Sequence, residues 1–148
     1  VLAVPFVLMS GSTTLFFEVF KPHIVKKKYN VFVCHHNDTY RDFLLKILGN
    51  FKNIINIVGE CKEYPCCLEW LEKDQEQITD CVLIALPSRL TNPSEILGAM
   101  TSEFSWIKFV TMSPFEINGL PDFYRKVGVS GHYVSDQKPI ELINLILN

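Results

Sequence analysis

Four apolar segments of the chain end in residues whose side chains decide whether a phosphate or metal site could form. These terminal residues are His35 with His36, Ala85, Thr111 and Ser135. If the segments are parallel strands, their carboxyl ends meet at the edge where α/β sheets bind ligands. Imidazole suits zinc, copper or nickel, whereas Mg²⁺ prefers oxygen ligands. Because the other positions offer no third soft ligand, we predict neither a metal site nor a cofactor here.

Hydrophobic periodicity predicts strands and helices in alternation. The expected strands are 31–34, 54–58, 81–85, 107–111 and 132–134, and the expected helices are 38–48, 64–71, 92–104, 121–127 and 139–147. In the first helix, Phe43, Leu44, Ile47 and Leu48 are expected on the buried face, and Gly49 at the C-cap. The strands are almost continuously apolar, which indicates a parallel sheet covered on both faces. We therefore predict a three-layer α/β fold.

Length and composition favour one globular domain. The chain has 148 residues, of which 48% are hydrophobic and 20% charged. Its net charge of −2 provides no basic surface for nucleic acid, so we expect no direct nucleic-acid binding. The apolar residues 1–9 are fewer than the ~20 that a membrane span needs. We expect residues 1–29 to be a non-membrane extension and residues 30–148 to be the domain, in the cytoplasm.

Five cysteines are present without zinc-finger spacing. Cys34 and Cys81 fall inside apolar strands, where a free cysteine behaves as a small hydrophobic residue. The other three, Cys61, Cys66 and Cys67, are candidates for redox sensing. We expect reduced thiols, as in most cytosolic proteins.

Several motifs occur in the order found in one family. They are His35-His36-Asn37 followed by Arg41, Ile57-Val58-Gly59-Glu60-Cys61, Gly128-Val129-Ser130-Gly131-His132-Tyr133 and Pro139-Ile140-Glu141-Leu142. Together they resemble the receiver (CheY-like) domain of response regulators, in its NarL/LuxR-type transcription-factor subfamily. The resemblance covers residues 30–148 and implies a flavodoxin-like (βα)5 fold with a five-stranded parallel sheet.

The resemblance also implies a chemistry that most of these residues cannot perform. In the family, an Asp after the third strand accepts a phosphoryl group, an acidic pair holds Mg²⁺, and a hydroxyl and a Lys contact the phosphoryl oxygens. Ala85 stands at the Asp position, His35 and His36 replace the acidic pair, and Ser135 replaces the Lys. Only Thr111 keeps the family's group. We therefore predict a pseudo-receiver with a degenerate phosphorylation pocket and no enzymatic activity.

A protein-interaction role fits the remaining features. By the resemblance, the face formed by the fourth helix, the fifth strand and the fifth helix contacts partners, and here it carries Phe123, Tyr124, Arg125, His132 and Tyr133. For Phe123 and Tyr133, burial in the core is an equal alternative. We expect a phosphorylation-independent regulatory domain that binds another protein or a second copy of itself, such as the N-terminal part of a transcription regulator. The alternative is a small-molecule or redox sensor on the same fold.

Overall fold

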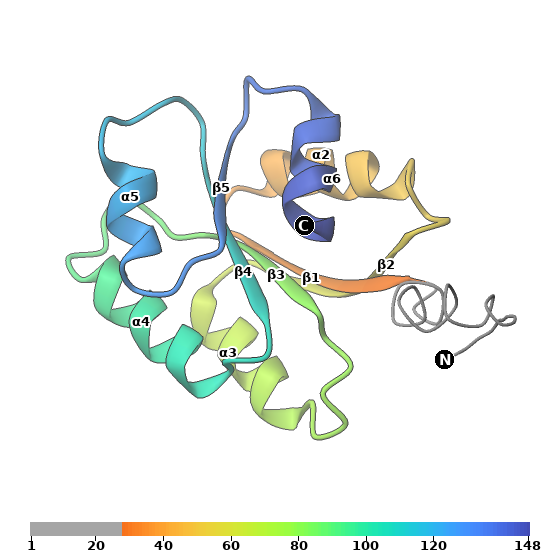
Figure 1. The fold of residues 1–148 in the computed structure, drawn as a ribbon, viewed down its shortest axis with the longest axis horizontal. Helices are drawn as coiled ribbons and strands as arrows, with labels where there is room; N and C mark the ends of the chain where they lie inside the picture. Colours follow the sequence, from red (N-terminus) through yellow and green to blue (C-terminus); the bar gives the residue numbers. More distant parts are fainter. Residues whose placement is uncertain (1–27) are drawn as a thin grey trace, which may run out of the picture.

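Every strand of the sheet is parallel, because a helix follows each strand and returns the chain to the same end of the sheet (Figure 1). The computed structural model describes residues 28–148. The spatial order is β2-β1-β3-β4-β5. The strands are β1 (Tyr29–His35), β2 (Ile55–Cys61), β3 (Cys81–Ala85), β4 (Lys108–Ser113) and β5 (Gly131–Val134). The predicted five-stranded flavodoxin-like fold is confirmed.

Local sequence explains where the helices begin. They are α2 (Asp38–Gly49), α3 (Tyr64–Lys73), α4 (Pro93–Glu103), α5 (Leu120–Arg125) and α6 (Pro139–Leu147). All of them except α2 have a proline in the first turn. Proline is tolerated there because the backbone N–H groups of the first turn make no hydrogen bond within the helix. Helix α2 begins instead at Asn37, whose side chain accepts the Tyr40 backbone N–H at 3.0 Å.

The sheet is buried on both faces by two helical layers. Helices α2 and α6 lie on one face, and α3 and α4 on the other (Figure 1). Along β1, Val31 and Val33 belong to the first core cluster, while Phe32 and Cys34 belong to the second. This alternation explains the continuous apolar strands, since both sides of each central strand exclude water.

Helix α2 differs from expectation at two residues. Phe43 is 49% exposed, although it was expected on the buried face. The buried residues Leu44, Ile47 and Leu48 form the packed face of the helix, and the middle of this face is about a quarter turn around the helix axis from Phe43. Gly49 is the last helical residue, and Asn50 caps the helix with right-handed geometry, so this end does not need the left-handed freedom of glycine.

Strand β2 extends three residues beyond its predicted end because it contains a bulge. The pairing with β1 shifts register between Val31 and Phe32, so that Phe32 lies opposite Gly59 and Cys34 opposite Cys61. A Cβ atom at Gly59 would lie 2.8 Å from the Phe32 ring, so only glycine fits without movement of that ring. The bulge therefore determines which residues meet at the carboxyl end of this strand pair.

The predicted extension, residues 1–29, lies outside the described residues except for its last two positions. Among residues 28–148, none of the helices is both long enough and apolar enough to traverse a lipid bilayer.

Candidate functional site

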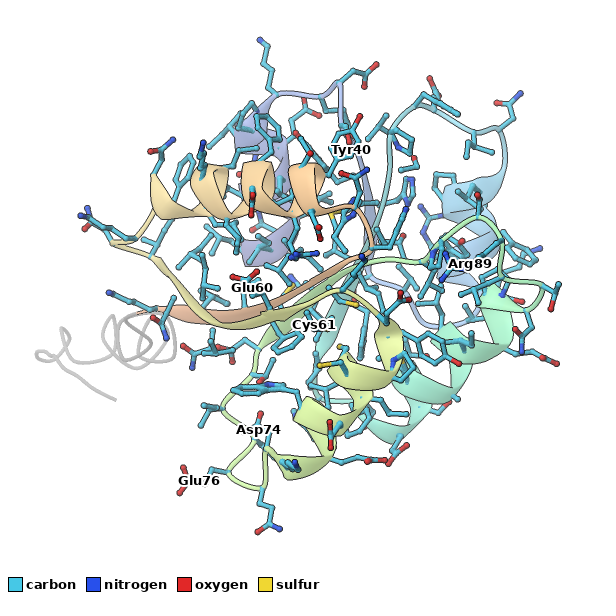
Figure 2. The ribbon with its side chains drawn as sticks, turned by 180° about the vertical axis from the view of Figure 1, so that it is seen from behind. Tyr40, Glu60, Cys61, Asp74, Glu76 and Arg89 are labelled. Carbon is cyan, nitrogen blue, oxygen red and sulfur yellow. The ribbon has the colours of Figure 1, made fainter. Side chains whose placement is uncertain are left out.

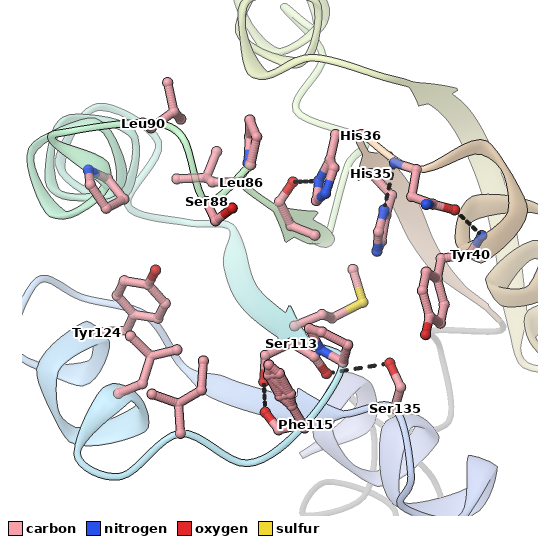
Figure 3. Close-up of a pocket in the computed structure, with 18 residues that line it drawn as sticks. His35, His36, Tyr40, Leu86, Ser88, Leu90, Ser113, Phe115, Tyr124 and Ser135 are labelled. Atoms are coloured by element: carbon pink, nitrogen blue, oxygen red, sulfur yellow. Dashed lines mark hydrogen bonds between the residues drawn. The ribbon is translucent and has the colours of Figure 1, made fainter.

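The ends of β1, β3 and β4 border a cavity of about 540 Å³ (Figure 3). His35, His36, Ala85 and Ser135 line it, as do residues of the loops that follow β3 and β4. Within residues 28–148, no Asp, Glu, Lys or Arg side chain lines this cavity. Its walls are mainly apolar side chains from Leu86, Leu90, Met112, Phe115, Ile117, Leu120 and Tyr124.

The side chain of His35 is a neutral imidazole ring that stacks on two other rings. Its Nδ1 accepts the Asn37 backbone N–H at 3.0 Å, which places the proton of the neutral ring on Nε2. The ring stacks on His36 with 4.9 Å between centroids and on Tyr40 with 5.6 Å. Burial, and then the nearby His36 and Arg41, lower the pKa of His35 to about 4. This side chain therefore carries no charge at neutral pH.

His36 is held by the last residue of β3. Its Nδ1 lies 3.3 Å from the Ala85 carbonyl oxygen, and because a carbonyl only accepts, this nitrogen is the donor (Figure 3). The two adjacent imidazoles thus each use Nδ1 for a backbone contact. In the segment 28–148, no group of three or more His, Cys, Asp and Glu side chains is arranged to hold a metal ion.

The acidic residues near the strand ends pair with Arg41. The guanidinium donates to Asp38 at 2.8 Å and to Glu60 at 3.2 Å, and its Nη1 donates to the His35 carbonyl oxygen at 2.9 Å. The hydrogen bond from Arg41 holds the pKa of the Asp38 carboxyl below its ordinary value. Since the cavity itself offers no carboxylate, its residues do not fit the Mg²⁺ ion that the family resemblance implies.

On the β4–β5 side, polar groups satisfy one another. His132 lies 2.8 Å from the Thr111 hydroxyl through Nδ1 and 2.8 Å from the Ser113 hydroxyl through Nε2. Ser113 donates its own proton to the Phe115 carbonyl at 2.8 Å, so it accepts from Nε2–H of His132. The Thr111 hydroxyl then donates to Nδ1 of His132. Burial lowers the pKa of His132, in agreement with this neutral ring.

Thr111 and Ser135 differ in their relation to the cavity. Thr111 is 2% exposed and does not line the cavity, and its hydroxyl bonds to His132. Ser135 lines the cavity and donates from Oγ to the Ser113 carbonyl at 3.3 Å. The five predicted pocket residues therefore lie at one sheet edge, but four of them face the cavity and Thr111 does not.

The predicted interaction residues occupy three environments. Phe123 and Arg125 are exposed on α5, and Arg125 pairs with Asp122 of the same helix. Tyr124 lines the cavity, and His132 is half-buried in the hydroxyl network. Tyr133 is a core residue, 2% exposed, whose hydroxyl donates to the Gln137 carbonyl at 2.7 Å.

The sequence interpretation missed two exposed apolar residues beside α5. Phe115 is 57% exposed and Ile117 is 43% exposed, both in the loop between β4 and α5. The sequence signal that could have identified them is a pair of large apolar side chains in a segment that has neither strand nor helix periodicity. It also missed Tyr40, which packs on His35, and Cys34, which contacts other thiols.

Comparison with protein-family models finds no match, and comparison with curated protein sequences finds none either. Solved structures do match. The signal receiver domain of the response regulator NarL from Mycobacterium tuberculosis is 17% identical at a TM-score of 0.69, over 82% of this chain and 94% of that one. A LuxR-family two-component response regulator from Aurantimonas is 12% identical at a TM-score of 0.67, over 79% and 81% of the two chains.

A longer structure gives the same result. The RcsB response regulator of Salmonella typhimurium is 12% identical at a TM-score of 0.68, and the match covers 80% of this chain but only 56% of that one. At these identities the similarity establishes the fold, not the chemistry. The described part of the chain has the fold of response-regulator receiver domains.

Proposed function

We propose that this chain is a phosphorylation-independent regulatory domain on the receiver fold that acts through contact with another protein surface. The observation that carries the proposal is Ala85 at the end of β3, with its carbonyl bonded to His36 and its methyl group facing the cavity. A methyl group has no lone pair with which to attack phosphorus.

The neighbouring groups support the same conclusion. Phosphoryl transfer depends on metal ions and cationic side chains that neutralise the transferred oxygens. His35 is neutral, Ser135 has no charge, and the hydroxyls of Thr111 and Ser113 are engaged with His132. None of these groups is free to stabilise a phosphoryl group.

The interaction surface that we propose is the α5 surface, defined as Phe115, Ile117, Phe123 and Arg125. Its three apolar members are between 43% and 57% exposed. Aromatic and arginine side chains are enriched at the centres of protein interfaces. The α5 surface therefore has the composition expected of a binding site for a protein or for a second copy of the chain.

Treatment with acetyl phosphate and Mg²⁺ tests the loss of aspartyl phosphorylation. We expect the intact mass to stay unchanged, while a receiver domain with its Asp, treated in parallel, gains one phosphoryl group. A brief incubation at alkaline pH identifies an aspartyl phosphate, because alkali hydrolyses acyl phosphates and leaves phosphohistidine intact. A labile phosphoryl group on this chain would refute the proposal.

Two phenylalanines of equal exposure test the α5 surface. Phe123 in α5 and Phe43 in α2 are both 49% exposed, and they lie on different helices. For a self-associating chain, Phe123→Glu should weaken the dimer at least about tenfold in sedimentation equilibrium, whereas Phe43→Glu should not. Equal effects of the two substitutions, or a wild-type chain that remains monomeric, would contradict self-association through this surface.

The cavity favours a second candidate function, the binding of a small molecule. A volume of about 540 Å³ without a charged lining suits an uncharged, largely apolar ligand. An uncharged fluorescent probe such as a naphthylamine should bind, and Ser88→Trp at the cavity should displace it. Binding that is unchanged in this variant would place the probe elsewhere.

A further inference from the structure

Four cysteines gather at the carboxyl end of β2, away from the cavity. Cys34 of β1, Cys61 of β2 and Cys67 of α3 are buried in one core cluster, and their thiols lie close enough to shift one another's pKa. The β2 bulge brings the first two together, because it places Cys61 directly beside Cys34 in the sheet. Figure 2 shows Cys61 at this strand end, above α3. We call these three residues with Cys66 the thiol cluster.

Cys61 is the centre of the thiol cluster. It contacts Cys34, Cys67 and also Cys66, which lies in the first turn of α3. The Cys61 thiol donates to the Glu63 carbonyl oxygen at 3.4 Å, and the Cys66 backbone N–H donates to the same oxygen at 3.1 Å. One carbonyl thus holds both residues across the short connection between β2 and α3.

Burial separates the roles of the four thiols. Cys34 and Cys67 are completely buried, Cys61 is 8% exposed, and Cys66 is exposed. As a thiolate, Cys61 accepts hydrogen bonds from Cys34 and Cys67, which lower its pKa. The hydrogen bond to Cys61 raises the pKa of Cys34. Cys61 therefore lies between two completely buried thiols and the thiol of Cys66, which solvent reaches.

We propose that Cys61 is a peroxide-sensitive thiol and that Cys66 is its disulfide partner. Cys67 follows Cys66 directly in the sequence, but it is a poor disulfide partner for Cys66 because both residues belong to one turn of α3. A Cys61–Cys66 bond instead closes the short connection through Lys62 and Glu63. This inference goes beyond the proposed function and does not depend on it.

The reaction balances with one molecule of hydrogen peroxide. The Cys61 thiolate attacks one peroxide oxygen, the O–O bond breaks, and the leaving hydroxide takes up a proton to form water. The Cys66 sulfur then attacks the sulfenic sulfur of Cys61, the S–O bond breaks, and hydroxide leaves with the Cys66 proton as a second water. Peroxide is reduced, and the two thiols are oxidised to one disulfide.

Tryptic mapping of the oxidised chain tests the proposal. Trypsin cleaves after Lys62, so Cys61 falls in peptide 53–62, Cys66 and Cys67 in 63–73, and Cys34 in 29–41. After brief treatment of the full chain with dilute peroxide, thiols are blocked and the digest is analysed without reductant. We expect peptide 53–62 to be disulfide-linked to peptide 63–73 and the link to disappear on reduction.

Cys81 provides an internal control. It is buried in the other core cluster, and burial raises its pKa to about 12. Cys61 should be oxidised at least about tenfold faster than Cys81. Equal rates, or the absence of the linked peptides, would overturn the proposal.

The variant Cys66→Ser identifies the partner, and its exposed position leaves the core intact. In this variant the linked peptides should disappear, and Cys61 should accumulate as sulfenic and sulfinic acid. A link that persists in Cys66→Ser would assign the disulfide to Cys67 and contradict the role of Cys66. The matched variant Cys66→Ala should behave in the same way.

Discussion

The two sides of the strand-end edge differ in how their polar groups are engaged. On the β1–β3 side, two stacked imidazole rings and a methyl group face an open cavity. On the β4–β5 side, polar groups are retained, but Thr111, Ser113 and His132 bond to one another. The first side therefore faces a cavity, whereas the hydroxyls of the second side are engaged in a hydrogen-bond network.

This difference separates ligand binding from stability. A cavity with apolar walls can bind a ligand, whereas a closed polar network mainly stabilises the pairing of β4 with β5 and the loop after β4. Substitutions on the β4–β5 side should therefore affect folding most, and substitutions on the β1–β3 side should affect binding and pH response.

The largest effect is expected at His132. His132→Ala removes hydrogen bonds to two hydroxyls and leaves the buried Thr111 hydroxyl only the Gly131 carbonyl at 3.4 Å, which should cost about 2 kcal/mol in the free energy of unfolding. His36→Ala is the matched control, because His36 is also half-buried but makes a single hydrogen bond, of 3.3 Å. Urea unfolding should show a loss below about 1 kcal/mol for that control. The reverse ranking would contradict the comparison between the two sides.

A smaller effect should appear in the pH dependence of stability. The pKa of His35 is about 4 in the folded chain and ordinarily 6.5, so the unfolded chain binds more protons between these values. The stability from neutral His35 is therefore complete above pH 6.5 and decreases as the pH falls toward 4. Between pH 7 and pH 5 the loss should be about 2 kcal/mol.

The substitution His35→Gln isolates this contribution, since glutamine accepts hydrogen bonds without titrating. Urea unfolding at pH 7 and at pH 5 should show a clearly smaller decrease for His35→Gln than for the unchanged chain. The same decrease in both proteins would assign the pH response to other groups.

The smallest effect is expected at Ser135. Its hydroxyl makes a single 3.3 Å bond to the Ser113 carbonyl, which the Ser135 backbone N–H already contacts at 3.0 Å. Ser135→Ala should change the free energy of unfolding by less than about 0.5 kcal/mol. A loss well above 1 kcal/mol, measured by thermal or urea unfolding, would show that this residue belongs to the closed network.

The fold was predicted from the sequence more accurately than the contacts at the candidate site. The strand Cys81–Ala85 and the helix Pro139–Leu147 match their predicted bounds, because continuous apolar residues and an initial proline are local signals. The bulge at Gly59 was not predicted, since it depends on a tertiary contact with Phe32. Without that register, the approach of Cys34 to Cys61 could not be expected.

The site shows the same limit. The residue types at the strand ends predict a site without aspartyl chemistry, and this stays a prediction. They did not reveal that Thr111 and Ser113 both bond to His132, because these contacts join strands β4 and β5. Nor did they separate exposed Phe123 from buried Tyr133, a distinction that only packing determines.

Titration of the ¹⁵N-labelled chain with Mg²⁺ and fluoroberyllate tests the central claim most directly, because this anion mimics a phosphoryl group on aspartate. The amide resonances of His35, Ala85 and Thr111 report on the strand ends around the cavity. We predict no saturable change in these resonances when both additives are present. Saturable shifts at these amides, dependent on both Mg²⁺ and fluoroberyllate, would contradict a receiver fold that works without phosphorylation.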